Sequence, residues 1–135
     1  MTLSIHVAVI GPLENNVYFL VDNSSGDCVV IDPSFEPQSQ LRLANEQGWQ
    51  LRQIWLTHGH FDHTAGAKVL SESFSPPLLV AMNRESYAWA AAQPESMKMG
   101  MQVNTIPRLD IPLIHGMWLD VSPAGSRKLV EVREV

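Results

Sequence analysis

Residues 57–63 read Thr57-His58-Gly59-His60-Phe61-Asp62-His63. They follow the short apolar run 54–56, which is typical of a buried strand. In an extended segment the side chains at positions i and i+2 point the same way, so His58 and His60 can converge on one point. Two imidazoles bind zinc well, and the Asp62–His63 pair suits a second metal of similar or harder character. The stretch therefore predicts a metal site at the carboxyl end of a strand, where α/β sheets collect functional groups.

The sequence on either side of this stretch alternates between strand and helix patterns. Apolar and β-branched runs predict strands over 3–10, 17–21, 28–31, 51–57 and 78–82. Apolar residues at helical spacing predict helices over 37–47, 64–74 and 84–92, with Gly48 ending the first and Asn83 capping the third. A long irregular loop is expected over 93–112, and a closing hairpin over 117–121 and 128–135. This order predicts a single α/β layered domain over residues 1–135.

Residues 57–63 and their upstream context resemble the metallo-β-lactamase superfamily. The stretch itself looks like the His-x-His-x-Asp-His signature of that fold. Residues 11–21 resemble the second-strand region of its hydroxyacylglutathione-hydrolase-like members. Val30-Ile31-Asp32-Pro33 is similar to their strand-ending Asp, and His63-Thr64-Ala65-Gly66-Ala67 to the start of their helix. The resemblance implies an αββα sandwich, of which this chain supplies the N-terminal half and a closing hairpin.

The resemblance also implies a role for each polar residue of the cluster. His58 and His60 would bind a first metal ion. Asp62 and His63 would bind a second, and Asp62 would be the catalytic residue that orients the attacking water. Asp32 would lie behind the ligands and hold an imidazole or a loop amide in place. A purely structural role for Asp32 stays open, because Asp-Pro is also common turn chemistry.

The chemistry that the resemblance implies follows from the ions. One or two zinc ions are expected, with iron or manganese as alternatives. A bound ion lowers the pKa of its water to about 7, so a metal-bound hydroxide exists near neutral pH. Such a hydroxide attacks the carbonyl of an ester, a thioester or a related acyl substrate. The implied function is therefore metal-dependent hydrolysis of a small molecule.

The sequence departs from the family in its last third. Relatives supply a third His to the first metal after a Thr-Pro-Gly-like turn, and residues 128–135 resemble the strand just before that ligand. His6 and His115 are the histidines outside the cluster, and neither falls at the family position. We therefore expect a fold whose C-terminal portion is missing, with two ligands to each metal and reduced metal affinity.

Composition excludes several other classes of protein. The 135 residues carry a net charge of −5, which argues against a nucleic-acid or anionic-membrane surface. No stretch approaches the ~18 uninterrupted apolar residues of a membrane span. Cys28 is the single cysteine and lies in an apolar run, so we expect a buried small hydrophobe and no intramolecular disulfide. These features favour a cytoplasmic location.

Two alternatives to a hydrolase stay open at this point. The first is a noncatalytic or weakly metal-binding domain that acts through oligomerisation or partner binding. An open sheet edge commonly pairs with another chain, so this alternative predicts a homo-oligomer formed through an exposed edge. The second is an iron protein with oxidative chemistry, as in some members of the superfamily.

Overall fold

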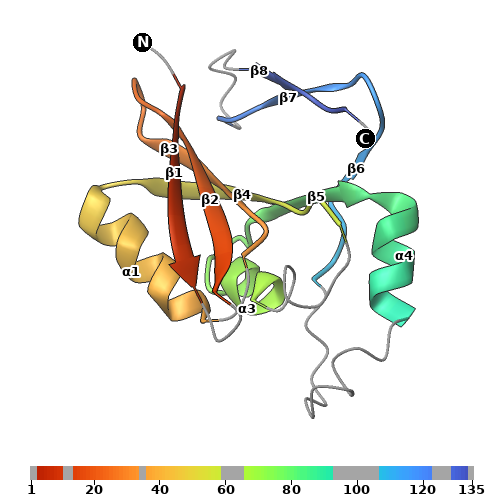
Figure 1. The fold of residues 1–135 in the computed structure, drawn as a ribbon, viewed down its shortest axis with the longest axis horizontal. Coiled ribbons are helices and arrows are strands. Elements are labelled where there is room, and N and C mark those ends of the chain that lie inside the picture. Colours follow the sequence, from red (N-terminus) through yellow and green to blue (C-terminus); the bar gives the residue numbers. More distant parts are fainter. Residues whose placement is uncertain are drawn as a thin grey trace.

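The computed structural model of the protein describes six stretches of the chain. They are residues 3–10, 14–33, 36–58, 66–92, 107–122 and 129–133. Within them the chain forms a large sheet, with helices packed on one face and a short hairpin on the other (Figure 1). The expected α/β layered fold is confirmed for this part of the chain.

The described residues form the following elements. The strands are β1 (Leu3–Ile10), β2 (Asn15–Asp22), β3 (Asp27–Ile31), β4 (Gln50–Trp55), β5 (Leu79–Asn83), β6 (Ile111–Leu113), β7 (Trp118–Asp120) and β8 (Leu129–Glu131). The helices are α1 (Pro37–Gln47), α3 (Ala67–Glu72) and α4 (Arg84–Ala92). Strands 3–10, 28–31 and 78–82 and helices 37–47 and 84–92 were thus predicted to within one residue at each end.

The strands of the main sheet lie in sequence order, β1-β2-β3-β4-β5-β6, in the part that the structure describes. β1, β2 and β3 pair antiparallel, whereas β3, β4, β5 and β6 pair parallel. Parallel neighbours end at the same edge of a sheet. The segments that follow β3 and β4 therefore lie side by side, and these are the segments that carry Asp32 and His58.

The middle strands of the main sheet are apolar on both faces because both of their faces are covered. Val30 and Ile54 point into a core shared with the helices. Val29 and Trp55, their neighbours in sequence, point into a second core under the hairpin. Successive residues of a strand face opposite sides, so a strand buried on both faces needs an uninterrupted apolar run. That is why residues 28–31 alternate so little.

The second layer is the antiparallel hairpin of β7 and β8, which confirms the expected closing hairpin. Leu119 and Val121 of this layer are buried against the main sheet. A buried amide links the two layers: the Gln53 side chain donates from Nε2 to the Asp120 and Val121 carbonyls, at 2.8 and 3.2 Å. Its Oε1 accepts a hydrogen bond from Trp55 Nε1 at 3.0 Å. Gln53 thus joins β4 to the end of β7.

Two predicted helix ends are confirmed by their hydrogen bonds. Gly48 adopts the left-handed conformation with φ of 76°, and its N–H bonds the last turn of α1. This conformation favours glycine, which explains why the helix ends there. Asn83 Oδ1 accepts a hydrogen bond from the Ser86 N–H at 3.1 Å and so caps α4.

Two boundaries differ from the sequence expectation. The loop predicted over 93–112 is wrong at its end, because Ile111 and Pro112 belong to β6, which pairs parallel with β5. A proline is tolerated there because β6 is the edge of the described sheet and needs no ladder N–H on its outer side. The helix predicted over 64–74 is described only over Ala67–Glu72, and residues 64–65 lie outside the described part. Among the described helices, none has the length and apolar character needed to cross a membrane.

Candidate metal centre

Asp32 and His58 are brought together by the parallel pairing of β3 and β4. Asp32 directly follows β3, and its backbone N–H bonds the Trp55 carbonyl at 2.9 Å. β4 is extended by one more contact, in which the Leu56 N–H bonds the Ala81 carbonyl of β5 at 2.9 Å. Thr57 and His58 come next, so the site begins at the carboxyl edge of three adjacent strands. This is the position where open α/β sheets bind their ligands.

The Asp32 carboxylate is buried and faces Thr57 with both of its oxygens. Oδ1 accepts the Thr57 backbone N–H at 2.8 Å, and Oδ2 accepts the Thr57 hydroxyl at 2.5 Å. The residue is 6% exposed, so these bonds hold a carboxylate that has left most of its water. Its backbone is left-handed, with φ of 54°, a conformation that Asp and Asn adopt more readily than most residues.

The hydroxyl of Thr57 continues this chain of contacts to His58. Thr57 Oγ1 lies 2.8 Å from His58 Nδ1. The closest approach of Asp32 Oδ2 to the same nitrogen is 4.0 Å, which is beyond hydrogen-bond distance. The His58 side chain is about one-third exposed, at 37%. Asp32 therefore reaches the imidazole through Thr57 and not directly.

The other predicted ligands, His60, Asp62 and His63, lie outside the described residues. The residues on either side of them are described, and both lie next to Asp32. His58 precedes the gap, and after it Gly66 donates its N–H to the Pro33 carbonyl at 3.3 Å. Within the described stretches no group of three or more His, Cys, Asp or Glu side chains could hold a metal ion. The four-residue ligand set therefore stays a prediction.

The described part of the site fits a metal ligand on chemical grounds. Histidines that bind metals through one ring nitrogen usually have the other nitrogen held by a hydrogen bond. His58 Nδ1 is held in this way by Thr57, which leaves Nε2 as the nitrogen suited to a metal. The sequence did not predict the role of Thr57. The available signal was a hydroxyl residue placed directly before the first His of the cluster.

His6, His115 and Cys28 are not part of the chain of contacts from Asp32 through Thr57 to His58. His6 lies on β1, stacks on Trp49 with ring centroids 4.6 Å apart, and contacts Ser4. His115 lies in the exposed turn between β6 and β7. Cys28 is fully buried, and this burial raises the pKa of its thiol to about 12. The expectation that Cys28 is a buried small hydrophobe is confirmed.

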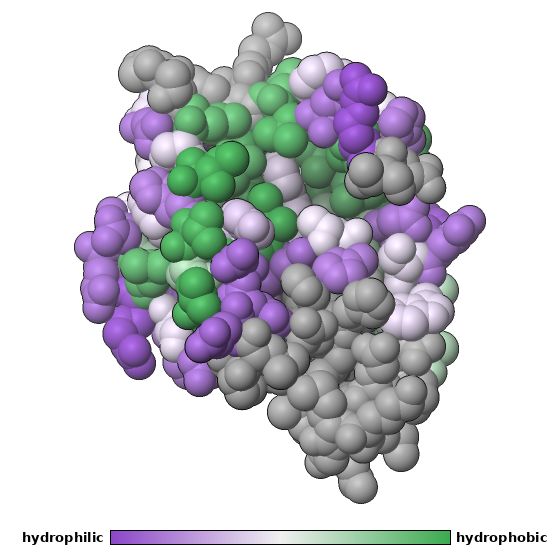
Figure 2. Space-filling view, in the orientation of Figure 1, coloured by the Kyte–Doolittle hydropathy of each residue, from purple (hydrophilic) through white to green (hydrophobic). Residues whose placement is uncertain are grey.

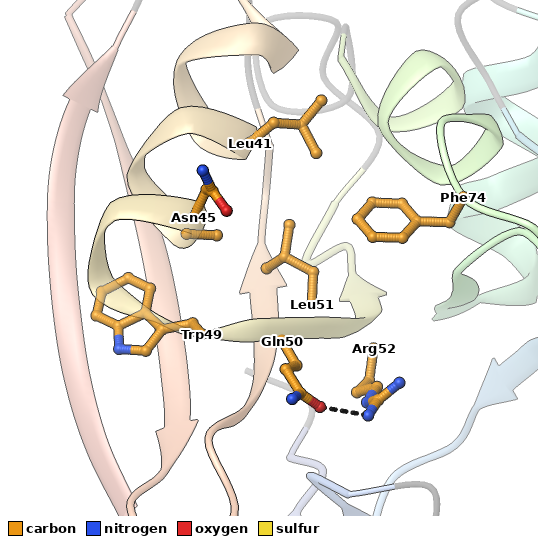
Figure 3. A pocket seen from close by; sticks show the side chains of 8 residues that line it. Leu41, Asn45, Trp49, Gln50, Leu51, Arg52 and Phe74 are labelled. Atoms are coloured by element: carbon orange, nitrogen blue, oxygen red, sulfur yellow. Dashed lines mark hydrogen bonds between the residues drawn. The ribbon is translucent and has the colours of Figure 1, made fainter.

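A groove of about 420 Å³ lies at the opposite end of β4 (Figure 3). Leu41, Leu51 and Phe74 form its apolar wall, and Arg52 lies at its rim. Arg52 is already engaged, because its guanidinium contacts the Asp27 carboxylate at 2.9 Å and the side chain of Gln50. The groove is at the amino end of β4, whereas His58 follows the carboxyl end, so the two are separate features.

Comparison with known proteins places the chain in a family. A probable metallo-hydrolase, YqgX from Bacillus subtilis, is 30% identical over 99 residues, which are 73% of this chain and 46% of that protein. A hydroxyacylglutathione hydrolase from Buchnera aphidicola is 37% identical over 62 residues, 46% of this chain and 24% of the relative. The chain thus spans about half the length, or less, of these curated relatives.

Solved structures agree in fold. The crystal structure of TTHA1623 in a di-iron-bound form matches with a TM-score of 0.69 and 30% identity, covering 84% of this chain and 56% of that one. The BLEG-1 B3 metallo-beta-lactamase matches in fold with a TM-score of 0.73 at 22% identity, covering 87% and 56%. The family model of the metallo-beta-lactamase superfamily matches residues 10–129. The chain belongs to the metallo-beta-lactamase superfamily, as the stretch from Thr57 to His63 had indicated.

Proposed function

We propose that this chain is a metal-dependent hydrolase of an ester, thioester or related acyl substrate, with zinc as its metal. The observation that carries the proposal is the hydrogen-bonded chain from Asp32 through Thr57 to His58 Nδ1, placed at the carboxyl edge of the sheet. This arrangement orients one imidazole for metal binding, in a chain that belongs to the metallo-beta-lactamase superfamily. Iron and manganese are alternatives, and TTHA1623 has been crystallised in a di-iron-bound form.

The proposed division of labour follows the family signature. His58 and His60 would hold the first ion, and Asp62 and His63 would hold the second. Bound ions would supply hydroxide near neutral pH, because a metal ion brings the pKa of its water down to about 7. Asp62 would orient a water molecule toward the acyl carbon. Asp32 keeps Thr57 and the start of the loop in place.

A hydroxyacylglutathione thioester is the first substrate to test, because several relatives are hydroxyacylglutathione hydrolases. The purified chain, grown in zinc-supplemented medium, should contain zinc and release free thiol from this substrate. His58→Ala should bind zinc more weakly and lose thiol release. His115→Ala is the matched control, because it removes an exposed histidine outside the site and should keep both. A wild-type protein that holds no zinc, iron or manganese would contradict the proposal.

Self-association is a second candidate function, favoured by an apolar strip on β1. The strip consists of Ile5, Val7 and Val9, which share one face of the strand and are 68%, 54% and 64% exposed. Figure 2 shows hydrophobic side chains gathered over the region of β1 and β2. Among the described residues β1 pairs only with β2, so its outer backbone edge has no strand partner there.

A second copy of this chain is the partner that β1 fits best. The strand contains no charged residue and no proline, which are the residues that usually protect an edge strand from pairing with another chain. Two copies can therefore pair through β1 without facing like charges, although each chain carries a net charge of −5. The edge strand β6, in contrast, is three residues long and contains Pro112. An antiparallel pair centred on Val7 sets Val7 against its copy and Ile5 against Val9, which are favourable β-branched pairs.

The size of this contact indicates a weak dimer. Eight residues make a strand roughly 27 Å long and about 10 Å deep, well below the ~800 Å² per partner of a stable complex. Sedimentation velocity should therefore show a dimer only as the concentration rises. Val7→Lys should abolish it, whereas Val69→Lys, the same change at a 48% exposed position of α3, should not. A wild type that stays monomeric, or a Val7→Lys variant that still dimerises, would reject self-association through β1.

A further inference from the structure

The hydrogen bonds among Asp32, Thr57 and His58 determine which of these groups carries each proton. Both oxygens of Asp32 act as acceptors toward Thr57, one for the backbone N–H and one for the hydroxyl. A hydroxyl has a single proton to donate, and Thr57 gives it to Asp32 Oδ2. Toward His58 the same oxygen can only accept. The proton between Thr57 Oγ1 and His58 Nδ1, 2.8 Å apart, therefore belongs to the ring.

We propose that Thr57 is a positioning residue that fixes the tautomer of His58, with the proton on Nδ1 and the lone pair on Nε2. The use of that lone pair for a metal rests on the proposed function, but the tautomer does not. Nδ1–H is the form in which a neutral imidazole offers Nε2 as a ligand. Thr57 thus decides which ring nitrogen is available before any ion arrives.

Two features explain why Asp32 holds His58 through Thr57 and not directly. Asp32 is 4.0 Å from Nδ1, so it cannot hold the ring itself. It is anchored by its own backbone, whose N–H bonds the Trp55 carbonyl, and by the Thr57 amide on Oδ1. The carboxylate is thereby fixed on one side of the hydroxyl and the imidazole on the other. A hydrogen bond to an ionised acceptor is stronger than a neutral one, so the carboxylate controls the direction in which the hydroxyl points.

Substitution of Asp32 by Asn gives the sharpest consequence. Asn Oδ1 still accepts the Thr57 N–H, which leaves the Nδ2 amide facing the Thr57 hydroxyl as a donor. The hydroxyl must then donate to His58 Nδ1 instead of accepting from it. The ring proton moves to Nε2, and the lone pair suited to the metal is lost. Asn tolerates the left-handed backbone of this position, so the fold should survive.

The tautomer can be read without any metal. Metal-free protein carrying ¹⁵N-labelled histidine is measured by long-range ¹H–¹⁵N correlation at pH about 8, and the His58 signals are identified by their absence in His58→Ala. We expect the Nδ1–H form in the wild type and in Thr57→Ser, which keeps the hydroxyl. We expect the Nε2–H form in Asp32→Asn and loss of the fixed Nδ1–H form in Thr57→Val. Circular dichroism confirms that each variant is folded.

Zinc titration of the same variants is the second readout. Loss of a group that orients a ligand typically weakens metal binding 10- to 100-fold, and we expect this for Thr57→Val and Asp32→Asn but not for Thr57→Ser. A Thr57→Val variant with the wild-type tautomer and wild-type zinc affinity would overturn the inference. If the tautomers change as expected while the wild type binds no zinc, the role of Thr57 stands and the proposed function fails.

Discussion

Replacement of Gln53 by Met tests how the second layer is held on the main sheet. Gln53 is 3% exposed, joins β4 to the end of β7 through two hydrogen bonds, and accepts a third from Trp55 of its own strand. Met has nearly the same length and fills the same space, but its thioether cannot donate and accepts only weakly. The substitution therefore removes the bonds while leaving the packing almost unchanged.

The expected cost follows from the groups left behind. The Trp55 indole N–H and the Val121 carbonyl are both buried, and each loses its Gln53 partner. A buried polar group left unsatisfied costs about 1–3 kcal/mol, so the loss of two partners should lower the free energy of unfolding by roughly 2–6 kcal/mol. A domain of this size is stable by only about 5–15 kcal/mol, so the loss is readily measured.

Urea unfolding followed by tryptophan fluorescence gives this free energy. Gln50→Met is the matched control, because Gln50 is exposed at the start of the same strand and its side chain accepts a hydrogen bond from the exposed Arg52. The control should change stability by no more than about 0.5 kcal/mol. Hydrogen exchange should also become faster in β7 and β8 of Gln53→Met. A loss below about 1 kcal/mol, or unchanged exchange in the hairpin, would refute the view that Gln53 holds the two layers together.

Two further predictions concern stability. Burial raises the pKa of Asp27, but hydrogen bonds from Ser122 and Arg52 and the charge of Arg52 outweigh it and hold the pKa below its usual value. A carboxyl group whose pKa is lower in the folded than in the unfolded state stabilises the fold at pH values above its unfolded-state pKa, and this gain is lost as pH falls through its folded-state pKa. Ser122→Ala should therefore destabilise the protein more at pH 7 than at pH 3, as measured by urea titration. An equal loss of stability at both pH values would contradict this. Leu70→Ala, at a fully buried position of α3, should lower the free energy of unfolding by about 2–5 kcal/mol in the same assay. Val69→Ala, at the exposed neighbouring position, should lower it by at most about 0.5 kcal/mol. Similar losses for the two variants would show that α3 does not pack as described.

The sequence predicted those elements whose cause is local. The apolar run 28–31 indicated a strand, and Asn83 and Gly48 marked helix ends, Asn83 through its side-chain oxygen and Gly48 through its left-handed backbone. β6 was missed because the proline rule for strands is relaxed at a sheet edge, and edge position depends on the whole topology.

The residue types of the candidate site could be predicted, but the hydrogen bonds between them could not. His58 could be named from its cluster of metal-binding residue types, and Asp32 from the resemblance to the family. The contact between Asp32 and Thr57 joins residues 25 apart in the chain, and that between Gln53 and Asp120 joins residues 67 apart. Hydroxyl and amide side chains carry no periodicity that reveals such distant partners. Only the parallel pairing of β3 and β4 brings Asp32, Thr57 and His58 into one hydrogen-bonded chain.

Titration of zinc into the metal-free wild type and into His58→Ala tests the central claim most directly. Isothermal calorimetry measures binding itself and does not depend on knowing the substrate. If His58 is a metal ligand prepared by Thr57, the wild type should bind zinc, His115→Ala should bind it equally, and His58→Ala should bind it at least tenfold more weakly. Equal zinc affinity in the wild type and His58→Ala, or no binding by the wild type, would contradict the assignment of this edge of the sheet as a metal centre.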